Sequence, residues 1–229
     1  MLSNLEKIIF VAMVIGSLGA SYITFKKMFK VILSGTNPIV WTDVIKNRNA
    51  GLIAFISQKT LFKTRPIVGF IHALVAWGFT LYLVVNIIDV LYGFIPNFKF
   101  LPKNVFGDVY RLFVDTFSIL VLLGVFYFLA RRFIMHEDRL TIKDPVLLSD
   151  RAKAGMKFDS FIVGAFIIVH IGSRFLSASF EIAIHGTDWS QPAANMVATL
   201  WSTLSPNTLT IAEHATWWLA LGLILLFLP

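Results

Sequence analysis

Five apolar segments, each long enough to cross a lipid bilayer, constrain the fold of this chain more than any other feature. A membrane-spanning helix needs about 20 consecutive, mostly apolar residues to cross roughly 30 Å of hydrocarbon. The segments that meet this requirement cover residues 7–25, 66–94, 111–131, 159–183 and 208–228. The sequence therefore predicts an all-α integral membrane protein. We expect residues 1–229 to form a single membrane domain, a five-helix transmembrane bundle.

The composition agrees with a membrane protein and excludes several kinds of chemistry. Of the 229 residues, 57% are hydrophobic and only 14% are charged, whereas soluble domains average about 25% charged residues. The chain has no cysteine, so it cannot hold a thiolate zinc site or an iron–sulfur cluster by itself. It also lacks a phosphate-binding glycine loop, a nucleophile elbow and a paired-histidine zinc helix. Hydrolytic and phosphoryl-transfer reactions are therefore not expected.

The basic residues indicate how the bundle is oriented. The connection 26–65 contains eight Lys and Arg residues and the connection 131–157 contains seven, whereas 184–207 contains none. Because basic loops stay on the cytoplasmic side, we expect the N-terminus outside and the C-terminus in the cytoplasm. The formal charge of +7 then reflects topology, and no nucleic-acid partner is expected. The expected location is the cell inner (cytoplasmic) membrane, crossed several times.

Three histidines within the spans are the most informative residues for function. An ionisable residue inside lipid costs on the order of 2.5–3.5 kcal/mol, so each one suggests a functional role. At a rise of about 1.5 Å per residue, His72 lies near the cytoplasmic end of its span. His170 and His214 lie at a similar depth in the outer half. Neutral imidazoles on facing helices are the usual axial ligands of a b-type haem, which needs two in its six-coordinate form.

Small residues flank two of these histidines and would let a haem ring approach the helices. They are Gly69, Gly78, Gly164 and Gly172. We therefore predict that some of His72, His170 and His214 are axial ligands of the haem iron. The alternative is that they only make hydrogen bonds between helices, as in a haem-free membrane anchor.

Arg174 is the fourth candidate site residue because it follows His170 by one helical turn on the same face. It is predicted to contact a haem propionate or a quinone carbonyl. Equally, it could form an ion pair with Glu181 or Glu213. His136 and His185 lie in or beside loops and receive no ligand role.

A proton-coupled transporter is a further alternative. Such a protein needs carboxylates in its interior. Asp89, Asp115 and Glu213 fall toward the outer half of the bilayer and could relay protons, but we expect them to be interfacial residues near the ends of their helices. No pair of Gly/Pro-interrupted helices marks a substrate site at the bilayer midplane.

Two stretches of the sequence resemble the motifs of a known membrane family. They are RPIVGFIHALVAWGF at residues 65–79 and WWLALGLILLFLP at residues 217–229. Together with the five spans, they resemble the nitrate reductase gamma-subunit-like membrane domain. The resemblance is closer to the version fused to or partnered with heterodisulfide-reductase-type iron–sulfur oxidoreductases.

The resemblance implies b-type haem ligated by the second and fifth spans, and electron transfer between iron–sulfur centres and a membrane quinone. His72 matches the cytoplasmic-side ligand of the second span. Tyr82 and Ala220 stand where members with two haems carry histidines, so the outer haem is absent here or rebuilt on His170 and His214. The family's fifth span continues into a stretch whose histidine would partner His72. We therefore expect this chain to be the membrane part of a longer polypeptide.

These inferences lead to one functional prediction. The chain is expected to be the haem-b-binding membrane component of a respiratory oxidoreductase, with one or two haems, rather than an enzyme alone. Electrons would pass between a cytoplasmic iron–sulfur or flavoprotein module, which carries any iron–sulfur clusters, and menaquinone or ubiquinone in the bilayer.

Overall fold

The computed structural model describes residues 2–35, 39–96, 98, 100–135, 137, 140 and 147–229. All the regular secondary structure in this part of the chain is helical. The elements are α1 (Asn4–Leu33), α2 (Trp41–Ser57), α3 (Lys59–Thr64), α4 (Pro66–Phe94), α5 (Val105–Phe133), α6 (Asp150–His185), α7 (Pro192–Ala198), the 3-10 helix η2 (Thr199–Trp201) and α8 (Pro206–Phe227).

Five of these helices, α1, α4, α5, α6 and α8, are long and apolar enough to cross a membrane. The predicted all-α membrane fold with five spans is therefore confirmed. Several helices run well past the predicted spans: α1 has 30 residues and α6 has 36. Their extra turns are rich in Lys and Arg, which are good helix formers, so the helices continue beyond the apolar segments. The orientation of the termini stays a prediction from the loop charges.

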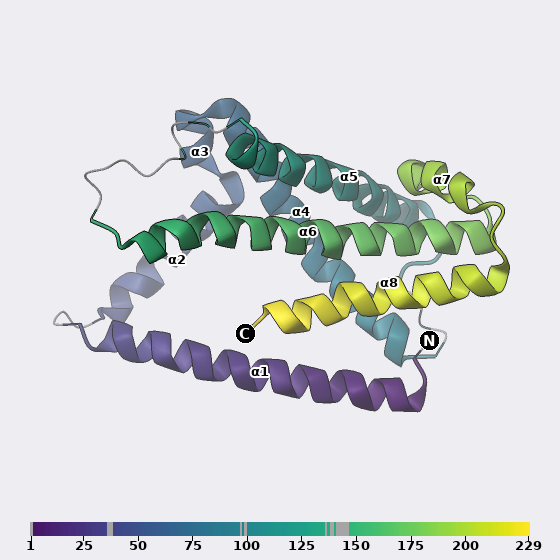
Figure 1. Ribbon diagram of the computed structural model, residues 1–229, viewed down its shortest axis with the longest axis horizontal. Helices are drawn as coiled ribbons and strands as arrows, with labels where there is room; N and C mark the ends of the chain where they lie inside the picture. Colours follow the sequence, from purple (N-terminus) through teal and green to yellow (C-terminus); the bar gives the residue numbers. More distant parts are fainter. Residues whose placement is uncertain are drawn as a thin grey trace.

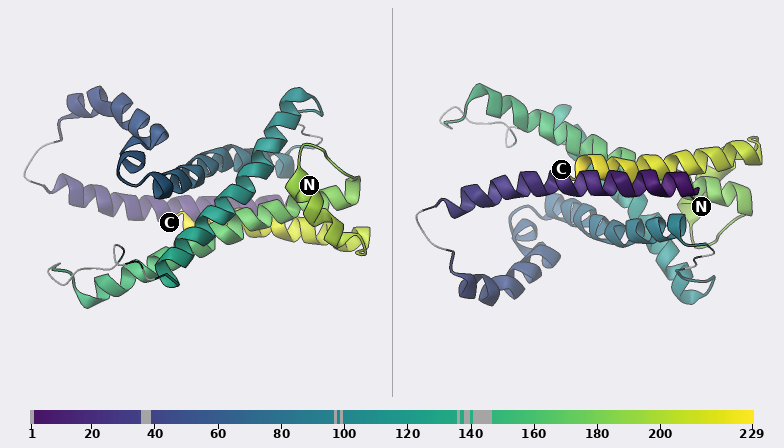
Figure 2. Two further views of the ribbon diagram at one scale, coloured as in Figure 1. Left: turned by 90° about the horizontal axis from the view of Figure 1, so that it is seen from above. Right: turned by 90° about the horizontal axis from the view of Figure 1, so that it is seen from below.

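Helix α6 is the central element of the bundle. It packs along α8 and also against α5 and α7, while α4 packs against α5 (Figure 1). The short helices α2 and α3 lie at the end of the bundle where α4 begins, and α7 lies at the opposite end (Figure 2). This arrangement brings α4, α6 and α8 together around the middle of the molecule.

The core between α4, α5 and α6 is built from Tyr82, Val85, Val121 and Ile171, all of them buried. Glycines allow the close approach of these helices. A Cβ atom on Gly124 would lie 2.7 Å from the Val75 side chain.

Three of the glycines that were expected to make room for a haem ring instead make room for a neighbouring helix. A Cβ on Gly164 would lie 2.6 Å from Leu129, one on Gly69 would lie 2.8 Å from the Leu61 backbone, and one on Gly78 would clash with Val121. Only Gly172 of the four faces open space, with no atom within 4 Å of an added Cβ.

Helix α1 is attached to the bundle mainly near its start. The Leu2 amide donates a hydrogen bond to the Gly93 carbonyl oxygen at 3.1 Å. The ring of Phe10, which is 5% exposed, packs against Phe94, Trp217 and Trp218 with centroid distances of 5.5–6.0 Å. Aromatic contacts of this kind contribute about 0.5–1.5 kcal/mol each beyond their buried area, so they fix α1 to α4 and α8.

Candidate functional site

An ion pair lies between α4 and α6. The Arg174 Nε atom is 2.5 Å from Oδ2 of Asp89, and Asp89 is 6% exposed. The Trp217 indole N–H on α8 donates to the backbone carbonyl of Asp89 at 3.2 Å. Sequence reasoning offered Glu181 or Glu213 as the ionic partner and placed Asp89 at the interface near a helix end. The partner in the structure is instead Asp89, which lies near the end of α4 but faces α6 and is enclosed by the neighbouring helices.

His170 lies one turn before Arg174 and is 2% exposed. Its Nδ1 atom is 3.0 Å from the carbonyl oxygen of Ala220 on α8. A carbonyl only accepts hydrogen bonds, so Nδ1 carries the proton and Nε2 is left as an acceptor. Nε2 faces the Asn86 side-chain amide nitrogen at 3.4 Å. The ring stacks on Phe166 at a centroid distance of 5.8 Å.

Asn86 leaves one hydrogen-bonding group unused beside His170. Its Oδ1 atom is buried and has no hydrogen-bond partner among the described residues. An unsatisfied buried acceptor costs about 1–3 kcal/mol, and such groups in native proteins call for a specific explanation. The pair of Asn86 and His170 therefore offers a buried acceptor to a ligand that carries a donor.

Tyr82 occupies the position where the resemblance would place a second haem ligand. Its hydroxyl is 2.7 Å from Ser118 Oγ on α5, and Ser118 donates to the Val114 carbonyl at 2.6 Å. The phenol therefore donates to Ser118. Beside it, a cavity of about 10 Å³ is lined by the polar side chains of Tyr82, Asp115, Ser118, Arg174 and Gln191. That volume is close to the minimum for one water molecule.

Asp115 holds the start of α7. Its two carboxylate oxygens accept hydrogen bonds from the backbone amides of Ala193 and Ala194 at 2.8 and 2.9 Å. Asp115 is 3% exposed and is therefore buried. It lies against α7, and its depth relative to the membrane interface stays a prediction. A carboxylate at the N-terminus of a helix satisfies free N–H groups and suits the helix dipole, which gives Asp115 a structural role.

His214 has different neighbours from His170. Its Nε2 atom is 2.5 Å from Oε1 of Glu6 on α1, and the Trp218 indole N–H donates to the same oxygen at 3.2 Å. Glu6 also accepts a hydrogen bond from the backbone N–H of Ser3 at 2.8 Å, as part of the capping box of α1. His214 thus helps to connect α8 to α1.

His72 is exposed on α4, one side of its ring facing Phe128 at a centroid distance of 6.3 Å. Its ring makes no hydrogen bond to any described residue. Of the other two histidines outside the candidate set, His185 is exposed at the end of α6 and His136 lies outside the described residues. Within the described part of the chain, no three His, Cys, Asp or Glu side chains are grouped closely enough to hold a metal ion.

The three predicted ligands therefore differ in how well they fit a haem iron. His72 offers an open imidazole. The N–H donation from His170 to a backbone carbonyl is the arrangement that orients most metal-binding histidines, but its Nε2 already faces Asn86. The Nε2 of His214 bonds Glu6. Of the three, His72 is the one whose two ring nitrogens make no hydrogen bond to a described residue.

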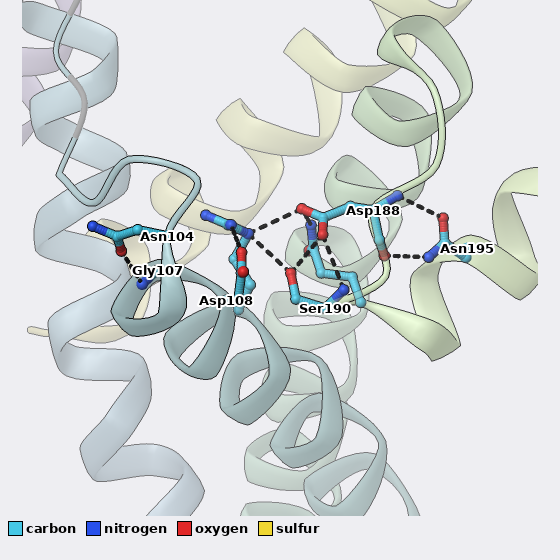
Figure 3. Close-up of polar contacts among 8 residues, drawn as sticks. Asn104, Gly107, Asp108, Asp188, Ser190 and Asn195 are labelled. Atoms are coloured by element: carbon cyan, nitrogen blue, oxygen red, sulfur yellow. Dashed lines mark hydrogen bonds and ion pairs between the residues drawn. The ribbon is translucent and has the colours of Figure 1, made fainter.

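A second polar cluster, which sequence reasoning missed, joins the start of α5 to the α6–α7 loop (Figure 3). The Arg111 Nε atom is 2.9 Å from Asp188 Oδ2 and 3.0 Å from Ser190 Oγ, and Arg111 also pairs with Asp108. Burial alone would raise the pKa of Asp188, but hydrogen bonds from Ser190 and the charge of Arg111 hold it below its ordinary value of 3.8. The Asp-x-Ser spacing of Asp188 and Ser190 is typical of turns stabilised by side-chain hydrogen bonds. This spacing could have indicated the cluster from the sequence.

The chain is similar to a curated protein, the probable iron-sulfur-binding oxidoreductase FadF of Bacillus subtilis (strain 168). The two are 28% identical over 171 residues, which cover 75% of this chain and 22% of FadF. The chain thus spans about a fifth of that relative's length. No protein-family model matches the chain, and no solved structure matches it significantly.

Proposed function

We propose that the chain is the haem-b-binding membrane component of a respiratory oxidoreductase. It passes electrons between a cytoplasmic iron–sulfur or flavoprotein module and the membrane quinone pool. The likeness to FadF supports an iron–sulfur partner, because this chain has no cysteine to hold such a cluster. The observation that carries the quinone part of the proposal is the unpartnered, buried Oδ1 of Asn86 beside His170.

Asn86 and His170 match the hydrogen-bonding needs of a quinone headgroup. A hydroquinone hydroxyl donates to Oδ1 of Asn86, and a quinone carbonyl accepts from its Nδ2. Oxidation of a hydroquinone sends two electrons to the redox partner and releases two protons, one to Nε2 of His170 and the other to the aqueous phase. Nε2 of His170 is unprotonated, since Nδ1 donates to Ala220, so it can take up a proton there. Phe166, stacked on His170, gives this site an aromatic wall.

His72 is the residue to which we assign a haem b. Its open imidazole is exposed on a membrane-spanning helix, where an unbonded polar group is costly. A haem bound there supplies one-electron transfer between the partner and the quinone. The contribution of His72 is to hold the iron, and the apolar surroundings, including Phe128, exclude water and tune the potential.

The quinone proposal is tested by separating haem binding from quinol reactivity. In the purified protein with its redox partner, Asn86→Leu should slow quinol-dependent haem reduction at least about tenfold, as expected for the loss of one or two buried hydrogen bonds. The amount of haem that dithionite reduces should be the same as in the wild-type protein. Thr80→Val on the same helix is the matched control, because among the described residues its exposed hydroxyl bonds only the Ala76 carbonyl. Equal quinol kinetics in Asn86→Leu and Thr80→Val would refute the site.

Two observations favour other functions. The hydrogen bonds of His170 and His214 are what a haem-free anchor would show, and that protein would purify without haem absorption. The buried Asp89 removes one objection to a proton-coupled transporter. A transporter would catalyse substrate flux in proteoliposomes without a redox partner.

A further inference from the structure

A cavity opens at the end of the bundle where α3 meets α4. It has a volume of about 360 Å³ and is lined by the first turn of α4 and by Thr64, Arg65, Tyr127, Arg131 and Glu137. This volume falls at the lower end of the range for small-molecule sites, about 300–1,000 Å³. None of these residues takes part in the proposed redox site.

The charges around this cavity favour an anion. Arg131 is 5% exposed and pairs with Glu137, while Arg65 is exposed and forms no ion pair with a described residue. The described residues that line the cavity therefore carry an excess of one positive charge. The first turn of α4 adds to this preference, because no side chain caps it and its free amides at Ile67 and Val68 favour anions.

The position of the cavity identifies the class of anion. Arg65 immediately precedes the span α4, and Arg131 lies in the last turn of the span α5. Both flank a membrane-spanning segment, at the level where phospholipid phosphates lie, and the adjoining connections are the basic ones. Basic pockets between membrane helices at this level bind anionic headgroups. Guanidinium groups suit the task because their donors match phosphate oxygens bidentately.

We propose that this cavity binds the phosphate of an anionic phospholipid, contacted by Arg65 and Arg131 and by the hydroxyl of Tyr127. The site is independent of the proposed electron transfer, since it requires neither haem nor quinone. It anchors the junction of α3, α4 and α5 to the cytoplasmic leaflet predicted by the loop charges.

The proposal is tested by lipid binding to the purified protein, measured by native mass spectrometry. Phosphatidylglycerol should bind one saturable site more tightly than phosphatidylcholine. Arg65→Gln should weaken phosphatidylglycerol binding about tenfold, the effect of losing one charge-assisted hydrogen bond. Lys63→Gln is the matched control, because Lys63 is an exposed basic residue two positions away that does not line the cavity. It should leave the affinity unchanged.

A second variant and a soluble competitor keep the test decisive. Tyr127→Phe should weaken binding without a change of charge, and circular dichroism should show that all variants remain folded. Inorganic phosphate should not displace the lipid. The proposal is overturned if Arg65→Gln and Lys63→Gln have equal effects, or if phosphatidylcholine binds equally well. It is also overturned if inorganic phosphate competes, since the cavity would then be a site for soluble phosphate.

Discussion

The guanidinium of Arg174 on α6 pairs with the carboxylate of Asp89 on α4, with 2.5 Å between Nε and Oδ2. The two residues are 85 positions apart in the sequence, yet their contact joins two spans in the interior of the bundle. His170 lies one turn before Arg174, and Trp217 donates to the backbone of Asp89. This group places two of the buried titratable side chains of the described residues, Asp89 and His170, beside the proposed quinone contact.

Breaking this ion pair should destabilise the protein strongly. Asp89→Asn leaves the charge of Arg174 without its partner, and removing one member of a buried pair costs about 3–5 kcal/mol. Denaturant unfolding in mixed micelles measures the change. Asp108→Asn is the control, because Asp108 is 53% exposed in its pair with Arg111 and should cost less than about 1 kcal/mol. The double variant Asp89→Asn, Arg174→Gln should recover part of the lost stability, because it removes both charges. A double variant no more stable than Asp89→Asn alone would contradict the account.

The contact between His214 and Glu6 should hold α1 against α8. Glu6→Gln removes the carboxylate that contacts both His214 and Trp218, so it should weaken the attachment of α1 to α8. Spin labels on α1 and α8 should then report a broader distribution of distances between the two helices. Lys7→Gln, the neighbouring position on α1, should leave the distribution narrow. A narrow distribution in both variants would mean that aromatic packing alone fixes α1.

Two glycines of α6 should respond oppositely to the same substitution. Gly164→Ala forces a methyl group to within 2.6 Å of Leu129, and overpacking of this kind costs about 1–3 kcal/mol. Gly172→Ala meets no atom within 4 Å and should be neutral or stabilising by up to about 1 kcal/mol, the gain in helix propensity. Unfolding of the two variants side by side measures the difference. Equal stabilities would show that α6 is not packed against α5 at Gly164.

The cluster around Asp188 should stabilise the protein down to acidic pH. The folded state holds the pKa of Asp188 below 3.8, so the stabilisation by its charge is fully present above that ordinary value. It is lost as the pH falls through the lower folded-state value. Asp188→Asn should therefore lower the thermal unfolding midpoint near pH 6, and the difference from wild type should vanish in strong acid. Asp43→Asn, on exposed α2, controls for the removal of one negative charge.

The five spans could be predicted from the sequence because length and apolarity alone define a membrane helix. The pairing of side chains between the spans could not. Arg174 had Glu181 and Glu213 near it in the sequence, but its partner, Asp89, comes from another helix. The rotation of α4 that turns Asp89 inward depends on packing at Gly78 and Gly124, which no local pattern reveals.

The histidines show the same limit at the candidate site. Counting residues along each span predicted their depths in the bilayer, and this prediction grouped His170 with His214. Their partners depend on helix rotation: His170 contacts Asn86 on α4, whereas His214 contacts Glu6 on α1. Asn86 itself carried no signal in the sequence, because an amide becomes informative only when its burial and its unused acceptor are known.

The central claim, that His72 binds a haem b, is tested most directly by the pyridine haemochrome spectrum of the purified protein. We predict b-type absorption in wild type and its loss in His72→Ala. His185→Ala, which removes another exposed histidine outside the proposed sites, should retain the full absorption. Absence of haem from the wild-type protein, or equal haem content in wild type and His72→Ala, would contradict the account.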